Sequence, residues 1–221
     1  MLDYLMDMDT AALLAVNGWN DAFQDVLWWL VSAKWSSALL MLALLWILVR
    51  KPGRHAMLVL AMLVLAFVLA DQISSGLIKH MVERLRPTRE PSLEGLVHIV
   101  NGYRGGMYGF VSSHAANSFA VATFISLVIR YRAAAVSLIG WALLQCYSRI
   151  YLGVHYPGDI MGGIIVGLAV GWLAWQLMKW LQRRFDIRPG CYNRSDTMAM
   201  VWALILTVVS LILIASCILW K

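Results

Sequence analysis

Three short groups of polar residues stand out in this sequence because of the chemistry that their side chains could carry out together. The first, residues 79–87, has the spacing K-x6-RP; the second, residues 111–114, reads VSSH; the third, residues 148–159, has the spacing SR-x5-H-x3-D. Together they supply three permanent cations, two imidazoles, one carboxylate and small hydroxyl groups. Cations attract an anion, and imidazoles can act as nucleophile, acid or base.

Lys79, Arg86 and Arg149 predict a site for a tetrahedral anion. Three cations that come together repel one another unless an anion lies among them, and guanidinium groups match the geometry of phosphate. Ser112 and Ser113 are typical amino-terminal caps. A helix that begins there would add unpaired N–H groups and the positive end of its dipole. We therefore expect a phosphate site.

The two histidines predict the reaction. Asp159 follows His155 by four residues, so a helix that begins at Pro157, where proline is tolerated, would bring the carboxylate to the ring. A carboxylate on one ring nitrogen fixes the tautomer and stabilises positive charge that develops during attack. His155 is then the expected nucleophile, and His114 the acid that protonates the leaving oxygen.

Each residue also has an ordinary structural explanation when it is considered alone. Lys79 could extend from a helix end towards water, Arg86 could be a solvated loop charge, and His114 could cap a helix. Arg149 and His155 are harder to explain in this way, because ionisable groups beside apolar spans are costly and usually functional.

Taken together, the three groups resemble the signature of the type 2 phosphatidic-acid-phosphatase superfamily, written K-x6-RP, PSGH and SR-x5-H-x3-D. The first and third match at every position, whereas the second has Val111 for proline and Ser113 for glycine. The resemblance covers roughly residues 55–182. It implies a six-helix membrane fold and a phosphatase that works without a metal or another cofactor.

The resemblance also implies a role for each matching residue. The phosphate would be held by Lys79, Arg86, Ser112, the Ser113 amide and Arg149. His155, oriented by Asp159, would attack phosphorus and become a phosphohistidine. His114 would protonate the departing group and then activate water. Serine keeps the backbone N–H that glycine offers at the second motif, so the departure there concerns local geometry more than mechanism.

The composition indicates which elements must position these groups. Apolar residues make up 61% of the 221 residues and charged residues 14%, against about 45–50% and about 25% in soluble domains. A soluble globule of this size could not bury so much apolar surface. We therefore expect an all-α integral membrane protein. The net charge of +6 fits basic loops beside a membrane better than nucleic-acid binding, and three cysteines without metal-ligand spacing predict no metal site.

Six apolar runs are candidate transmembrane helices. They lie at about 26–50, 56–79, 113–131, 133–150, 158–182 and 197–219. Lys34 interrupts the first run, so whether 26–50 is a full span stays open. Ten of the 18 basic residues lie in alternate joins near 50–54, 130–132 and 179–194, which the positive-inside rule assigns to the cytoplasm. The three polar groups then share the external face.

We expect residues 1–221 to form a single membrane phosphatase domain. Residues 1–25 contain aspartates and no lysine or arginine, which predicts no signal peptide. Their apolar positions indicate an interfacial amphipathic helix, with a frayed polar terminus as the alternative. The loop of residues 80–112, rich in glycine and proline, predicts a shaped external active-site loop.

An external site at the membrane surface would meet lipid headgroups, so the expected partners are a lipid phosphate or pyrophosphate and the bilayer. Within the resembling family we favour undecaprenyl pyrophosphate as substrate, with lipid A and phosphatidylglycerophosphate as alternatives. The motifs do not separate these lipids. Substrate choice would depend on the loop of about 88–111, together with Arg84, Arg89, Arg104 and Tyr103.

An anion transporter or channel is the alternative from another class, since basic residues near the membrane could bind a transported anion. Such proteins tend to show repeated halves and charges at mid-depth, whereas here no repeat is visible. The family resemblance also implies a bacterial inner membrane, with the site facing the periplasm or exterior. The sequence does not indicate the oligomeric state.

Overall fold

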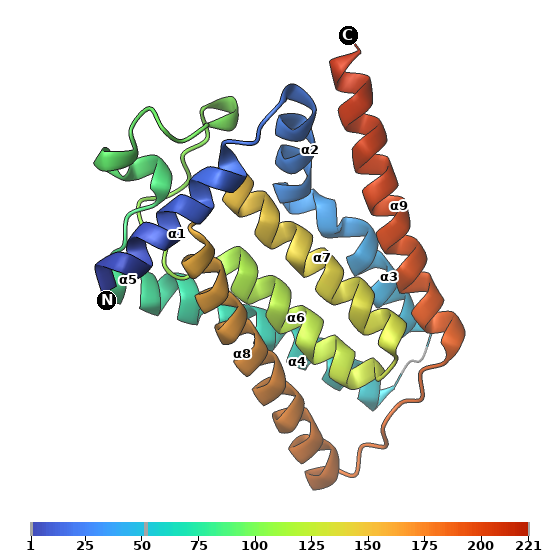
Figure 1. Ribbon diagram of the computed structural model, residues 1–221. Helices are drawn as coiled ribbons and strands as arrows, with labels where there is room; N and C mark the ends of the chain where they lie inside the picture. Colours follow the sequence, from blue (N-terminus) through green and yellow to red (C-terminus); the bar gives the residue numbers. More distant parts are fainter. Residues whose placement is uncertain (1, 51–52, 221) are drawn as a thin grey trace.

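The computed structural model describes residues 2–50 and 53–220, which form a bundle of helices without β-strands (Figure 1). In chain order the α-helices are α1 (Leu2–Asn17), α2 (Ala22–Ser32), α3 (Ala38–Val49), α4 (Arg54–Asp71), α5 (Lys79–Val82), α6 (Ser113–Ile129), α7 (Arg132–Tyr151), α8 (Pro157–Arg184) and α9 (Arg194–Leu219). A π-helical segment, η2 (Gln72–Ile78), joins α4 to α5, and four 3-10 turns are η1 (Lys34–Ser37), η3 (Pro87–Arg89), η4 (Pro91–Leu93) and η5 (Val100–Gly102). The all-helical membrane fold that the composition predicts is therefore confirmed.

Four continuous helical segments are long and apolar enough to cross a membrane: Arg54–Val82, Arg132–Tyr151, Pro157–Arg184 and Arg194–Leu219. The predicted run 26–50 is not one straight helix. The chain becomes extended at Ala33, so α2 and the following helical segment meet at an angle of 65°. If this bent pair is one span, the described residues contain five candidates. Helix α6 is shorter, with 17 residues, so a total of six spans stays a prediction.

Helix α6 lies at the centre of the bundle, between α4, α7 and α8 (Figure 1). Its contact with α8 includes three glycines of α8, each four residues from the next: Gly163, Gly167 and Gly171. An added Cβ at these positions would lie 2.5, 2.5 and 2.6 Å from the backbone oxygens of Ser112, the cap of α6, and of Ala116 and Ala120 in α6. Small residues at this spacing let membrane helices approach backbone to backbone. The amino-terminal ends of α6 and α8 are thereby held side by side.

The amino-terminal segment is helical, but residues 1–25 do not form one helix. Helix α1 ends at Asn17 and α2 begins at Ala22. Leu13 is fully buried and packs in a cluster with Leu93, Val97 and Tyr156, whereas other apolar positions, including Leu5 and Met6, are exposed. Helix α1 therefore lies across the ends of α7 and α8, and its position at a membrane interface stays a prediction.

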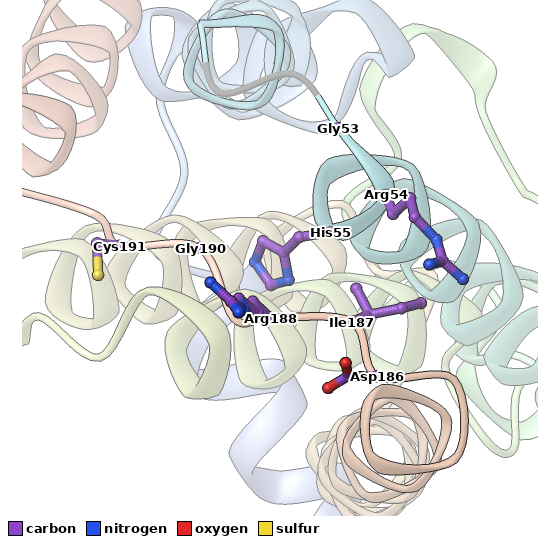
Figure 2. A pocket seen from close by; sticks show the side chains of 8 residues that line it. All are labelled: Gly53, Arg54, His55, Asp186, Ile187, Arg188, Gly190 and Cys191. Atoms are coloured by element: carbon purple, nitrogen blue, oxygen red, sulfur yellow. The ribbon is translucent and has the colours of Figure 1, made fainter.

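The start of α4 and the basic join between α8 and α9 meet at the end of the bundle opposite the polar motifs (Figure 1). His55 at the start of α4 hydrogen-bonds with Gln182 of α8 over 3.0 Å and with Tyr192 over 3.3 Å. An open pocket of about 380 Å³ lies here (Figure 2). It is lined by Gly53, Arg54, His55, Asp186, Ile187, Arg188, Gly190 and Cys191. None of the predicted site residues lines it.

Candidate active site

Lys79 brings the first motif to the second. The π-helical segment η2 ends directly before Lys79, and the Lys79 ammonium donates a hydrogen bond to the Ser113 hydroxyl at 2.9 Å. The same hydroxyl lies 2.6 Å from the hydroxyl of Ser75, which is part of η2. The serine that replaces the motif glycine therefore connects α6 to the end of the α4 segment.

Arg86 is buried beneath the long loop. Its Nε donates to the Tyr108 carbonyl at 3.1 Å and its Nη1 to the Val154 carbonyl at 3.4 Å. The loop passes so closely that a Cβ at Gly105, where φ is +65°, would lie 2.6 Å from Nη1. Burial, followed by the charge of Arg149, lowers the pKa of Arg86 from its ordinary value. A nearby anion would offset both effects.

Arg149 reaches the site from the end of α7 and is 3% exposed. Its Nη1 donates to the hydroxyl of Ser32, the last residue of α2, and its Nη2 donates to the Tyr103 hydroxyl at 3.2 Å. The buried Nε has no partner among the described residues. Because a buried N–H without a partner is costly, Arg149 retains a donor that a bound anion could satisfy.

The second motif forms the start of α6, as its serines predict. Ser112 is the amino-terminal cap, and its hydroxyl accepts a hydrogen bond from the Ala115 N–H at 3.4 Å. The Ser112 N–H donates to the Asp159 carbonyl at 2.9 Å. This bond fixes the second motif directly against the third. His114, half-buried, lies on the first turn of α6.

His155 and Asp159 form the pair that the four-residue spacing predicts. Helix α8 begins at Pro157, and His155 Nδ1 lies 3.3 Å from Asp159 Oδ2. The same Oδ2 accepts a hydrogen bond from the Tyr156 N–H at 3.1 Å, while Oδ1 accepts one from Arg84 at 3.0 Å. The contact at Nδ1 leaves Nε2 as the ring nitrogen available for chemistry.

The electrostatic surroundings of His155 indicate that the three motifs converge. Burial is the largest cause that lowers its pKa well below the ordinary value. The charges of Arg86, Arg149, Lys79 and His114 act in the same direction. The imidazole is therefore kept neutral, and its lone pair is available near neutral pH.

Several other residues near the site have roles that the motifs did not indicate. Arg84, expected to take part in substrate choice, pairs with Asp159 and with Asp9 of α1. Arg89 donates to the Gly105 carbonyl at 3.3 Å. A part for these arginines in substrate choice stays a prediction. A sequence signal for Asp9 was absent, because an aspartate in an acidic terminal segment has no distinguishing spacing.

Two further loop residues are occupied by internal contacts. Arg104 donates to the Thr88 carbonyl at 3.4 Å, and Tyr103 lies beside Arg149. Across the described ranges, histidine, cysteine, aspartate and glutamate form no group of three or more that could hold a metal ion. The independence of metal that the resemblance implies stays a prediction.

Fold and site together define a class: a helical membrane protein with a buried histidine–aspartate pair beside converging cations. Residues 57–183 match the PAP2 superfamily, and this chain belongs to that superfamily. The resemblance stated from the three motifs is therefore confirmed. The chain is a multi-pass membrane phosphatase that acts on lipid phosphate.

Curated relatives extend the similarity beyond the matched region. Proteins named lipid A 4'-phosphatase from Porphyromonas gingivalis and Bacteroides thetaiotaomicron are 32% and 34% identical. The alignments cover 92% and 96% of this chain and 88% and 97% of those proteins. Undecaprenyl-diphosphatase BcrC from Bacillus subtilis is 30% identical over 84 residues, which is 38% of this chain and 42% of that protein.

A solved structure has the same fold. It is a transmembrane PAP2-type phosphatidylglycerolphosphate phosphatase from Bacillus subtilis, with a TM-score of 0.58 and 21% identity. The similarity covers 84% of this chain and 90% of the other chain. Because the identity is low, this likeness supports the arrangement of helices and no finer property.

Proposed function

We propose that this protein removes a phosphate group from lipid A. The supporting observation is the extent of the similarity to the two lipid A 4'-phosphatases, which covers 92% and 96% of this chain. Undecaprenyl pyrophosphate, the substrate favoured from the family resemblance, is supported only by a partial alignment. We therefore prefer lipid A, the alternative named from the sequence.

The site binds phosphate through three cations and the start of α6. Arg149 offers its buried Nε–H, and Lys79 and Arg86 contribute charge from the first motif. Ser112 and the Ser113 amide add hydrogen bonds. These groups stabilise the charge that spreads over the equatorial phosphoryl oxygens in the transition state.

In the first step the lone pair of His155 Nε2 attacks phosphorus and a nitrogen–phosphorus bond forms. The bond between phosphorus and the lipid oxygen breaks and its electrons go to that oxygen. His114, whose protonated form is stabilised by the bound phosphate anion, supplies a proton to it. The ring, still protonated at Nδ1, becomes positively charged. The Asp159 carboxylate, 3.3 Å from Nδ1, stabilises this charge.

In the second step His114, now neutral, removes a proton from water, and the water oxygen attacks phosphorus. The nitrogen–phosphorus bond breaks, its electrons return to Nε2, and inorganic phosphate leaves. The imidazole is neutral again and His114 is again protonated. No metal takes part in either step.

The proposal is tested by phosphate release from lipid A, undecaprenyl pyrophosphate and phosphatidylglycerophosphate, measured side by side with purified protein in EDTA. We expect release with the highest kcat/KM on lipid A. His155→Ala should insert and fold but lose turnover, and rapid acid-free quenching of the wild type should trap a phosphohistidine. Substantial turnover by His155→Ala would overturn the mechanism, and a preference for either other lipid would overturn the choice of substrate. A protein that releases no phosphate would favour the transporter alternative.

We also propose that the site faces the periplasm from a bacterial inner membrane, and that residues 1–221 act as one domain. Alternate basic joins support this orientation. The packing of α1 on α7 and α8 supports the single domain, since α1 lies outside the region matched to the superfamily.

A further inference from the structure

We propose that helix α1 completes the active site, and that Asp9 is a positioning residue for the nucleophile. Asp9 holds Arg84, Arg84 holds Asp159, and Asp159 holds His155. The inference rests on the proposed phosphohistidine mechanism and adds residues that the three motifs do not contain. It also assigns a function to a helix outside the region matched to the superfamily, residues 57–183.

A continuous series of polar contacts connects α1 to His155. Asp9 Oδ2 lies 2.8 Å from Arg84 Nη1, and the same nitrogen lies 3.0 Å from Asp159 Oδ1. The other oxygen of Asp159 lies 3.3 Å from His155 Nδ1. One guanidinium nitrogen therefore bridges two carboxylates, and the second carboxylate orients the nucleophile.

The burial of these groups makes the contacts more than a surface ion pair. The side chains of Asp9 and Arg84 are 13% and 19% exposed, and that of Asp159 is 0% exposed. Exposed pairs contribute little because water screens them, whereas a buried carboxylate that loses its partner is strongly destabilised. The Arg84 guanidinium also lies 3.8 Å from the centre of the Tyr156 ring, which limits its movement.

Asp9 makes a second contact next to the catalytic pair. Its Oδ1 accepts a hydrogen bond from the Gly158 N–H at 2.7 Å, in the first turn of α8. A Cβ at Gly158 would lie 2.7 Å from Asp9 Oδ2, so the glycine permits this close approach. An anion at a helix amino terminus is also favourable. Asp9 thus holds both the arginine and the backbone beside Asp159.

Helix α1 is itself fixed to the rest of the protein. Asn17, at its end, is 0% exposed and donates to the carbonyls of Tyr151 and His98 at 2.7 and 2.9 Å. The Asn17 side-chain oxygen accepts from the His98 N–H at 2.8 Å. These bonds and buried Leu13 make α1 a fixed support, not a frayed terminus.

The test compares Asp9→Asn with Asp7→Asn, a matched control, since Asp7 lies on the same helix and is exposed. Asp9→Asn should lower kcat by about 10–100-fold, the effect seen when a group that orients a metal ligand is lost, which we take as the scale for a group that orients a nucleophile. KM should change little, because the phosphate-binding residues are untouched. Asp7→Asn should leave both parameters unchanged.

A double variant separates an effect through Arg84 from a general loss of structure. If Asp9 acts through Arg84, the variant Asp9→Asn/Arg84→Gln should be no slower than Arg84→Gln alone. The proposal would be overturned if the rate losses of Asp9→Asn and Arg84→Gln multiplied in the double variant. It would also be overturned if Asp9→Asn raised KM without changing kcat, or if it behaved like Asp7→Asn.

A readout without turnover distinguishes this proposal from the proposed function. In ¹⁵N-histidine NMR spectra of the purified protein, Asp9→Asn should shift the His155 ring-nitrogen signals, and Asp7→Asn should leave them in place. If the wild type hydrolysed no lipid phosphate but the shift occurred, the proposed function would fail while the contact through Arg84 stood. An unchanged His155 signal in Asp9→Asn would refute the positioning role whatever the activity.

Discussion

In the proposed mechanism, the protonation state of His155 sets the pH range in which this nucleophile can act. Burial, aided by the nearby cations, lowers its pKa well below the ordinary value. An imidazole whose pKa is lowered stays neutral until the pH falls below that lowered value. We therefore expect kcat/KM, which reports ionisations of the free enzyme, to fall on the acid side only well below pH 6.5, the ordinary value for histidine.

This prediction is checked by the pH dependence of kcat/KM, measured at lipid concentrations well below KM, with the ionisation of the substrate phosphate titrated separately. A fall in activity centred at or above the ordinary pKa of histidine, and not explained by ionisation of the substrate, would contradict the prediction.

Arg84→Gln should also change the acid side of the pH profile, because the substitution removes the partner of Asp159.

Residues of the site could be predicted where their contacts are local. Asp159 reaches His155 because four residues separate them at the start of a helix, and this spacing is readable in a sequence. The pairing of Arg84 with Asp159 spans 75 positions, and its pairing with Asp9 joins two segments that only the fold brings together. Without a periodic or motif signal, such contacts depend on three-dimensional packing alone.

At the scale of elements, the α6–α8 contact predicts different effects on stability when alanine replaces Gly167 of α8 and when it replaces Gly140 of α7. Alanine at Gly167 would place a Cβ 2.5 Å from the Ala116 carbonyl oxygen, whereas at Gly140 of α7 nothing lies within 4 Å. Alanine favours a helix by about 1 kcal/mol over glycine, but overpacking costs about 1–3 kcal/mol. Because backbone cannot move aside easily, Gly167→Ala should be destabilising and Gly140→Ala neutral or stabilising.

The measurement is thermal unfolding of both variants in detergent, with activity recorded in parallel. Gly167→Ala should unfold at a lower temperature than the wild type and should lose activity, because the starts of α6 and α8 carry the site. An unfolding temperature of Gly167→Ala equal to or higher than that of the wild type would contradict the prediction, because α6 and α8 would then accommodate the added methyl group without destabilisation.

The long apolar helices could be predicted from hydrophobic runs, whereas the bent pair formed by α2 and the following helical segment could be predicted only in part. Lys34 raised the question of whether 26–50 spans the membrane as one helix, but no breaking residue marks Ala33, where the chain turns. The bend depends on packing: the Ser36 hydroxyl donates to the Val31 carbonyl at 2.7 Å, and Gln145 of α7 donates to the same carbonyl at 2.7 Å. Such support from another helix is invisible in the local sequence.

At the scale of the whole molecule, the proposed orientation predicts the accessibility of two exposed positions, Ser92 in the long loop and Arg188 between α8 and α9. In a chain whose three cysteines are replaced by alanine, single cysteines at these positions would be treated with a membrane-impermeant maleimide in sealed right-side-out vesicles. Ser92→Cys should react at once, and Arg188→Cys only after detergent is added. The reverse pattern would place the site in the cytoplasm.

The three glycines of α8 also restrict how a lipid can reach the phosphate site. Backbone lies against backbone along this seam, so no hydrocarbon tail can slide between α6 and α8. In the proposed mechanism the acyl chains of a substrate must then stay in the bilayer on another flank of the bundle, while the headgroup alone reaches over the rim to the imidazoles.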